Sequence, residues 1–368
     1  MIRQHVSPTL LWKRSCSILS GAVIRGKHDH AALSGTELKN YLLEKTQLTS
    51  ASNSTIKLLK ALYARKKRKD KDLILLEGHR LVLDALRSGL RPLHVLLTDR
   101  GLHAPLGKEL LQELVTGLSM RVDDRGRVRV GSYQEARPTG MNTGTDTTAG
   151  ISPVMEMISD ALMASTLSDV EVPQGVVATF TRPAFALGGA KATRRSPAQA
   201  PLVLLLDQWS DPGNVGAAIR TAYGLGVHSV VAVGGTCDVW NPKALRAAMG
   251  TTLRVPVQRT SWATLRTAAS AGTLLPAILP GSTAAEGQDL QILVADCDPR
   301  AVPYDSVQYT RPTLLVVGSE TGLSGDAQKL VEAGAVKVFI PIAQELDSLN
   351  VGVATAIILA EAARQRRA

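Results

Sequence analysis

The chain has 368 residues, 45% hydrophobic and 4% aromatic, which suits two domains with tails and cores built from aliphatic side chains. No apolar run approaches the ~18 residues of a membrane span. The three cysteines, Cys16, Cys237 and Cys297, have no CxxC spacing, so we expect no disulfide framework and no metal site. The net charge of +10 and the sequence pI near 9.6 favour a polyanionic partner such as nucleic acid, although a basic leader would also raise them.

The N-terminus has the composition of a targeting segment. The first 28 residues contain five basic residues, four serines and no acidic residue. Loosely spaced apolar residues from Leu10 to Leu19 fit an amphipathic helix. This composition is typical of a mitochondrial or plastid transit peptide and unlike a secretory signal. We therefore predict a leader over residues 1–45 and a mitochondrial matrix location, with an ordinary disordered tail as the alternative.

A first folded region is predicted over residues 54–185. Residues 54–69 predict one basic amphipathic helix. Strands are predicted at 72–77, 92–98 and 174–180, and helices at 78–88 and 104–117; this alternation indicates an α/β unit. Residues 132–153 are turn-rich and lack periodicity, so they predict a mobile insertion. Residues 186–200 have the composition of an interdomain linker.

A second α/β domain is predicted over residues 201–368. It begins with a nearly continuous apolar strand at 202–207, as expected where both faces of a parallel sheet are covered. Further strands are predicted at 229–233, 254–258, 291–295, 313–317 and 336–341, with helices at 214–224, 242–250, 262–271, 326–333 and 349–366. In such sheets ligands bind at the carboxyl edge, so the loops that follow the strands are the candidate site.

The first of these loops leads into the helix that begins near Asn214. Pro212 and Gly213 predict a sharp turn, Asn214 an N-cap, and Gly216 a close approach of helix or ligand. Arg220 follows in the second turn. The glycine spacing is G-x-x-G without a third glycine, which argues against a dinucleotide-binding dehydrogenase.

Two further loops carry polar groups at strand ends. Gly318 and Gly322 bracket Ser319 and Glu320, which gives a backbone free to approach a ligand and one carboxylate at the end of a buried strand. Ser348 and Asn350 precede the last apolar helix, where a plain N-cap is the simplest interpretation. If the sheet is parallel, these two loops lie beside each other.

In this order the three segments resemble the three motifs of the SpoU/TrmH branch of the SPOUT methyltransferases. The correspondence covers N-x-G-x-x-x-R-T-A from Asn214, V-G-S-E-x-G-L-S from Val317, and I-P-x…S-L-N-x-x-x-A from Ile340. Residues 237–250 are similar to the mitochondrial rRNA methyltransferase 3 subgroup of this family. Residues 56–57, 77–80 and 173–178 are similar to its L30e-like substrate-binding domain.

The resemblance implies a C-terminal α/β domain closed by a deep trefoil knot and preceded by a smaller L30e-like RNA-binding domain. It implies that S-adenosylmethionine is bound in the knot by Gly318, Gly322, Ile340, Ile342, Ser348 and Leu349. It places Asn214, Arg220, Glu320 and Asn350 at the reaction centre. It also implies a homodimer whose active site draws on both chains.

The activity that follows is 2′-O-ribose methylation of RNA, with mitochondrial large-subunit rRNA within pre-ribosomal particles as the expected substrate. A basic run in the substrate domain, Arg65, Lys66, Lys67 and Arg68, is interpreted as an RNA-backbone contact, with a solvated helix end as the alternative. Two other functions stay open. An inactive ribosome-assembly factor of the same fold is disfavoured by the intact Asn, Arg and Glu, and a tRNA methyltransferase only by residues 237–250.

Overall fold

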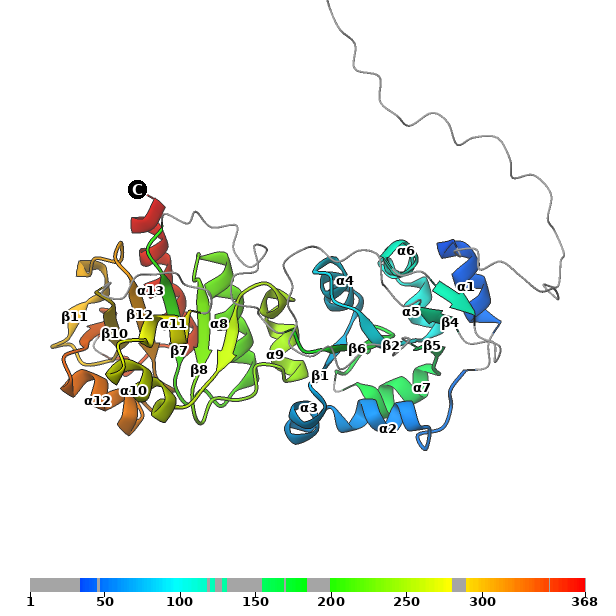
Figure 1. Cartoon of the computed structure of the whole chain (residues 1–368), viewed down its shortest axis with the longest axis horizontal. Helices are drawn as coiled ribbons and strands as arrows, with labels where there is room; N and C mark the ends of the chain where they lie inside the picture. Colours follow the sequence, from blue (N-terminus) through cyan, green and yellow to red (C-terminus); the bar gives the residue numbers. More distant parts are fainter. Residues whose placement is uncertain are drawn as a thin grey trace, which may run out of the picture. The chain divides into compact units, whose positions relative to one another are not determined.

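The computed structural model of the chain describes residues 34–44, 47–117, 120–122, 128–130, 154–168, 170–183, 199–279, 289–343 and 345–367 (Figure 1). The predicted leader up to residue 33, the predicted insertion and most of the predicted linker lie outside the described residues. Within the described ranges, no helix combines the length and apolar composition that a membrane crossing requires.

The N-terminal part of the described chain forms a six-stranded mixed sheet in the order β1-β6-β2-β5-β4-β3 (Figure 1). Its strands are β1 (Leu73–Glu77), β2 (Pro92–Leu97), β3 (Met120–Val122), β4 (Val128–Val130), β5 (Val154–Met157) and β6 (Val176–Thr181). One face packs against α1 (Gly35–Leu43), α4 (His79–Arg87), α5 (Asp99–His103) and α6 (Gly107–Gly117). The other packs against α2 (Ser54–Ala61), α7 (Asp160–Leu162) and the π-helical turn η1 (Met163–Leu167).

Helix α1 lies inside the range 1–45 that was predicted as a leader, so that boundary is too far along the chain. Leu38 and Leu42 are buried in the same core as α4 and α6. Ser34 accepts a hydrogen bond from the N–H of Glu37, whose carboxylate accepts one from the N–H of Ser34. This reciprocal cap fixes the start of α1, and its apolar face supplies the packing that a leader would lack.

The single helix predicted over 54–69 is two helices, α2 and α3 (Arg65–Lys71). The guanidinium of Arg68 donates to the carbonyls of Leu62 and Tyr63 at 2.7 and 2.8 Å, so a side chain of the second helix satisfies acceptors at the end of the first. A helix end leaves carbonyls without partners, and this contact supplies them where the chain turns.

The C-terminal part forms a seven-stranded sheet in the order β11-β13-β10-β12-β7-β8-β9, in which every pair is parallel (Figure 1). The strands are β7 (Leu202–Leu206), β8 (Ser229–Ala232), β9 (Val257–Arg259), β10 (Gln291–Ala295), β11 (Val302–Pro303), β12 (Thr313–Val317) and β13 (Val336–Phe339). The predicted α/β fold class with a parallel C-terminal sheet is confirmed. The trefoil knot stays a prediction.

Alternation along β7 explains why this strand is apolar throughout. Leu202, Leu204 and Leu206 pack with α8 (Pro212–Gly224), α9 (Pro242–Ala247) and α13 (Val351–Arg367). Val203 and Leu205 pack with α10 (Trp262–Ser270), α11 (Leu274–Ile278) and α12 (Gly325–Glu332). Successive side chains of a strand point to opposite faces, so helices on both faces bury every residue.

The register places three loops at one edge. Leu206 pairs with Val317, Val317 with Ala295, and Ala295 with Val338, so the carboxyl ends of β7, β12, β10 and β13 are level. The chain leaves this edge after β7 towards α8, after β12 towards α12, and after β13 towards α13. The three predicted site loops therefore start at the same edge, those after β7 and β12 from neighbouring strands and the one after β13 beyond β10.

Candidate active site

Three of the four residues predicted at the reaction centre meet at this edge. The Asn214 amide donates from Nδ2 to Glu320 Oε1 at 3.0 Å. Asn350 Nδ2 reaches Asn214 Oδ1 at 3.5 Å, a long hydrogen bond. These contacts join residues 106 and 136 positions apart, one from each loop. The Asn214–Glu320–Asn350 group is thus an exposed polar cluster built from three loops.

Asn214 is available for this cluster because it is not the helix cap that its position suggested. The N-cap of α8 is Asp211, whose Oδ2 accepts from the N–H of Asn214 at 2.9 Å, and Pro212 occupies the first turn. That backbone hydrogen bond, reinforced by one from Lys243 Nζ at 3.2 Å, lowers the pKa of Asp211. The cap holds the first turn of α8 while the Asn214 side chain points to Glu320.

Glu320 is at the tip of a tight loop. Ser319 and Gly322 exchange backbone hydrogen bonds of 3.0 and 2.9 Å, which leaves Glu320 and Thr321 between them. A Cβ on Gly318 would lie 2.6 Å from the carbonyl oxygen of Gly322, and Gly322 itself has φ +100°. Both positions need glycine, because a side chain would clash at the first and strain the backbone at the second.

Asn350 both caps a helix and contributes to the cluster. Its Oδ1 accepts from the N–H groups of Gly352 and Val353 at 3.0 and 3.3 Å, at the start of α13. This acceptor role orients the amide so that Nδ2 faces Asn214. The N-cap interpretation is confirmed and is compatible with the site interpretation, which stays a prediction.

Arg220 is on α8 but is not bonded to the other three. Its side chain is exposed, and in the described part of the chain no hydrogen bond or ion pair engages its guanidinium. An always-charged fork of five N–H donors in this state is suited to bind an anion such as phosphate.

The residues predicted to bind the cofactor follow β12 and β13. Gly318 is buried, Ile340, Ile342 and Leu349 are half-buried, and Gly322 and Ser348 are exposed. Between the described residues of 341–349, one backbone hydrogen bond forms, from Leu346 N–H to Ala343 O at 3.1 Å. Peptide groups without partners beside apolar side chains suit a flat heteroaromatic ring with polar edges.

The predicted RNA-binding run is only partly exposed. Lys66 and Lys67 face solvent, but Arg68 is 3% exposed. Besides the two carbonyls at the end of α2, its guanidinium binds Asp238 Oδ2 at 2.6 Å. Arg68 is therefore committed to an internal ion pair, and its interpretation as an RNA contact is wrong for this structure.

Sequence reasoning missed the buried groups behind the cluster. Asp207 is 0% exposed and accepts from Trp262 Nε1 and from Ser324 N–H, each at 3.0 Å. The indole of Trp209 donates to the carbonyl of Val317 at 3.0 Å. The signal was present: Asp207 is an acid directly after the buried strand β7, much as Glu320 follows Gly318 and Ser319 after β12.

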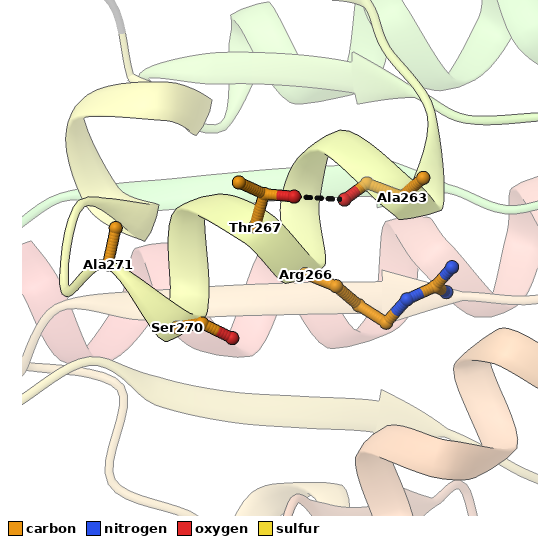
Figure 2. A pocket seen from close by; sticks show the side chains of 5 residues that line it. All are labelled: Ala263, Arg266, Thr267, Ser270 and Ala271. Atoms are coloured by element: carbon orange, nitrogen blue, oxygen red, sulfur yellow. Dashed lines mark hydrogen bonds between the residues drawn. The ribbon is translucent and has the colours of Figure 1, made fainter.

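A shallow hollow elsewhere, on α10, lacks comparable chemistry. Figure 2 shows it lined by Ala263, Arg266, Thr267, Ser270 and Ala271. Arg266 is paired with Asp326 at 2.5 Å, and Thr267 donates to the Ala263 carbonyl at 3.1 Å. Its principal polar groups already have partners within the protein.

Two family models match the chain. Residues 201–360 match the SpoU rRNA Methylase family, and residues 53–121 match the MRM3-like substrate binding domain. The first match contains all three loops of the polar cluster, and the second contains the basic run.

Known proteins show the same similarity. The chain is 29% identical over 313 residues to the 23S rRNA (guanosine(2553)-2′-O)-methyltransferase RlmP of Bacillus subtilis, covering 85% of this chain and 97% of that one. It is 28% identical over 336 residues to the mitochondrial rRNA methyltransferase 3 of Homo sapiens, covering 80% and 68%. An AdoMet-bound rRNA methyltransferase from Sinorhizobium meliloti has a TM-score of 0.61 at 24% identity over 87% of this chain and 97% of that one, which shows a common fold.

Proposed function

Because the chain belongs to the SpoU/TrmH family and carries an MRM3-like substrate-binding domain, we propose that it methylates ribose 2′-hydroxyls of RNA with S-adenosylmethionine as donor. The observation that carries this proposal is the Asn214–Glu320–Asn350 group, which joins three loops at the carboxyl edge of a parallel sheet. RNA 2′-O-methylation is also the activity in the name of the Bacillus subtilis relative.

The segments beside the cluster fit the cofactor. The peptide groups and half-buried apolar side chains of 340–349 would hold the adenosine, and the backbone at Gly318, where a Cβ would meet Gly322, would approach it closely. When bound, S-adenosylmethionine supplies a methyl group already activated by a sulfonium charge. The protein must then chiefly align a ribose oxygen with that carbon, which can lower a barrier by roughly 7–11 kcal/mol.

The four reaction-centre residues divide this work. Arg220 binds the phosphate next to the target ribose, because its exposed guanidinium offers a fork of N–H donors and no acceptor for a proton. Glu320 accepts a hydrogen bond from the 2′-hydroxyl and would take up its proton as the oxygen gains the methyl group. Asn214 holds Glu320 in place through the 3.0 Å contact, and Asn350 holds Asn214.

The substrate we propose is mitochondrial large-subunit rRNA within pre-ribosomal particles, methylated in the matrix by a homodimer. The basic, acid-free first 28 residues and the similarity to human mitochondrial rRNA methyltransferase 3 support the mitochondrial location. Exposed Lys66 and Lys67 in the substrate-binding domain support the polyanionic partner.

The test is to map ribose methylation across mitochondrial rRNA in cells with the gene, without it, and complemented with Asn214→Ala. The proposal expects one or a few sites that disappear without the gene and return only with the active protein. If no rRNA site is lost, and ribosome assembly fails in the null line but is restored by Asn214→Ala, the protein is an assembly factor. A site lost from tRNA would identify a tRNA methyltransferase.

Arg220→Lys separates two roles for the arginine in vitro. A phosphate clamp uses the planar fork, so lysine should restore little of the methyl transfer lost in Arg220→Ala. Full activity in Arg220→Lys would contradict the bidentate clamp.

A further inference from the structure

Asp207 contacts both ends of the loop that carries Glu320. Its backbone N–H donates to the carbonyl of Val317, the residue before Gly318, at 3.0 Å. Its Oδ2 accepts from the N–H of Ser324, the residue after Leu323, also at 3.0 Å. One residue at the end of β7 therefore closes the loop Gly318–Leu323 from behind.

Trp262 completes this arrangement. Its indole Nε1 donates to Asp207 Oδ1 at 3.0 Å, so each carboxylate oxygen has a donor from a different element. Trp262 is at the start of α10, 8% exposed, and packs on the face of the sheet that contains Val203 and Leu205. The indole orients the carboxylate so that Oδ2 meets Ser324.

A carboxylate in this place is costly unless it has a specific use. Asp207 is 0% exposed, and burying a charged or polar group is unfavourable unless each atom is hydrogen-bonded. Well-packed apolar residues often replace buried charges without loss of stability, so simple packing does not require an acid here. What an apolar residue could not supply is the contact to Ser324, which fixes the far end of the loop, since the contact to Val317 is made by the backbone.

The same strand end also leads to Asn214. Four residues after Asp207, Asp211 caps α8 through the N–H of Asn214. Asp207 therefore connects the Glu320 loop to the chain segment that positions Asn214, the hydrogen-bond partner of Glu320. Inside the loop, the Ser319–Gly322 backbone pair sets its shape but not its place on the sheet.

We propose that Asp207 is a positioning residue of the methyl-transfer site. Asp207 holds Gly318 in the position proposed to bind the cofactor, and it holds Glu320 within reach of Asn214. Asp207 itself contacts neither S-adenosylmethionine nor RNA. This inference rests on the proposed function for its catalytic consequence, but the anchoring of the loop stands independently of it.

The test is Asp207→Asn, which keeps the size but leaves one acceptor oxygen for two donors. Its amide N–H₂ must face either the indole N–H or the Ser324 N–H, so one bond is replaced by an unpaired donor. We expect methyl transfer (kcat/KM for S-adenosylmethionine) to fall by about tenfold to hundredfold. Affinity for RNA, measured at fixed salt, should stay within about twofold.

Two matched variants separate positioning from general loss of stability. Val203→Ala removes packing on the same strand and the same sheet face as Trp262 but leaves the loop contacts intact. Trp262→Phe removes the donor to Oδ1 and leaves the Ser324 contact, so its effect on kcat/KM should lie between wild type and Asp207→Asn. If Val203→Ala, assayed at an equal fraction folded, loses as much activity as Asp207→Asn, the positioning role is overturned.

Hydrogen exchange supplies a readout that does not depend on activity. In Asp207→Asn the amides of Ser319, Gly322 and Ser324 should exchange at least about tenfold faster while those of β7 and β12 do not change. Unchanged exchange at these three amides would overturn the anchoring. If Asp207→Asn does not fold, Trp262→Phe, which loses only the donor to Oδ1, should show a smaller increase at the same amides, and no increase there would overturn the anchoring. If the wild-type protein binds no S-adenosylmethionine but the three amides still exchange faster in Asp207→Asn, the proposed function is wrong. The anchoring of the loop by Asp207 is then still supported.

Discussion

The loops after β7 and β12 differ from the segment after β13 in how firmly the protein holds them. The first two are tied together by Asp207, by the Trp209 indole on the Val317 carbonyl, and by the Asp211 cap. Residues 341–349 have one backbone hydrogen bond between described residues, and Leu346 is 49% exposed. The polar cluster is therefore largely formed on the anchored side, and the segment that we propose holds the adenosine has few hydrogen bonds of its own.

This difference indicates what each side does. Groups that act on a reacting atom must be in place beforehand, since reorganising them during the reaction would raise the barrier. A segment that wraps a cofactor can be ordered by the binding energy itself, at a cost in affinity. Four predictions test whether the loops after β7 and β12 are more firmly held than residues 341–349. They run from the largest expected effect to the smallest.

Asn214→Ala removes the centre of the cluster from the anchored side. We expect methyl transfer to fall by roughly 100-fold, because Glu320 and Asn350 both lose the partner that places them. The free energy of unfolding should change by less than about 0.5 kcal/mol, since Glu320 and Asn350 are exposed and Asn214 is only half-buried. Single-turnover kinetics and urea unfolding measure the two effects, with Gln328→Ala on α12 as an exposed helical control.

The pairing itself is tested by combining Asn214→Ala with Glu320→Gln. The double variant should lose less activity than the product of the two single losses, because both remove one shared interaction. Strictly multiplicative losses would mean that the two residues act independently, and a large loss of stability in Asn214→Ala would make the cluster structural.

Gly318→Ala pushes the anchored loop open. The added Cβ would lie 2.6 Å from the Gly322 carbonyl oxygen, so we expect affinity for S-adenosylmethionine to weaken roughly tenfold or more, as measured by calorimetry. Gly325→Ala is the matched control seven residues on, because its Cβ would meet nothing within 4 Å. That control should bind normally and gain about 0.4–1 kcal/mol of stability. Equal binding by both variants would refute the close approach at Gly318.

The sequence predicted this geometry unevenly, for physical reasons. Apolar runs located β7 and β12, and the rule that ligands bind at carboxyl ends placed Glu320 and Asn350 at the correct edge. The prediction of Asn214 as the cap is wrong, because Asp211 followed by Pro212 is the stronger signal for a helix start. The resemblance to a family supplied which polar residues matter, since spacing alone allowed plain caps.

Local sequence patterns could not reveal contacts between residues far apart in the chain. Arg68 belongs to a run of basic residues, and only its ion pair with Asp238, 170 positions away, shows that it points inward. The break between α2 and α3 depends on the same guanidinium. Strands β3, β4 and β11, of two or three residues each, are too short to show a period.

Addition of S-adenosylmethionine should order the lightly held segment more than the anchored loops. We expect amide exchange of residues 341–349 to slow by at least about fivefold, because ligand contacts replace solvent at unpaired peptide groups. Amides of Ser319, Gly322 and Asn214, already hydrogen-bonded, should change by less than about twofold. Mass-spectrometric hydrogen exchange with and without saturating ligand makes the comparison. If S-adenosylmethionine slowed amide exchange equally in residues 341–349 and in the loops after β7 and β12, the two regions would not differ in how firmly the protein holds them.

The Asp211 cap should give the smallest effect, and one that depends on pH. Asp211→Ala removes the acceptor for the N–H of Asn214 and should lower the free energy of unfolding by ~1 kcal/mol at neutral pH. Asp211→Asn keeps an acceptor oxygen and should lose only a few tenths of that.

The sign of the pH dependence follows from the lowered pKa of Asp211, caused first by the backbone hydrogen bond from Asn214 and then by Lys243. A carboxyl whose pKa is lower in the folded state stabilises the fold above its ordinary value of 3.8, and this contribution is lost as the pH falls through the folded value. The difference in unfolding free energy between wild type and Asp211→Asn should therefore be present at pH 6 and shrink towards pH 3. Comparing the two proteins by urea unfolding cancels the carboxylates they share. A difference that grew towards acid pH would mean that the charge of Asp211 does not help hold the first turn of α8, and the anchored side would depend on Asp207 and Trp209 alone.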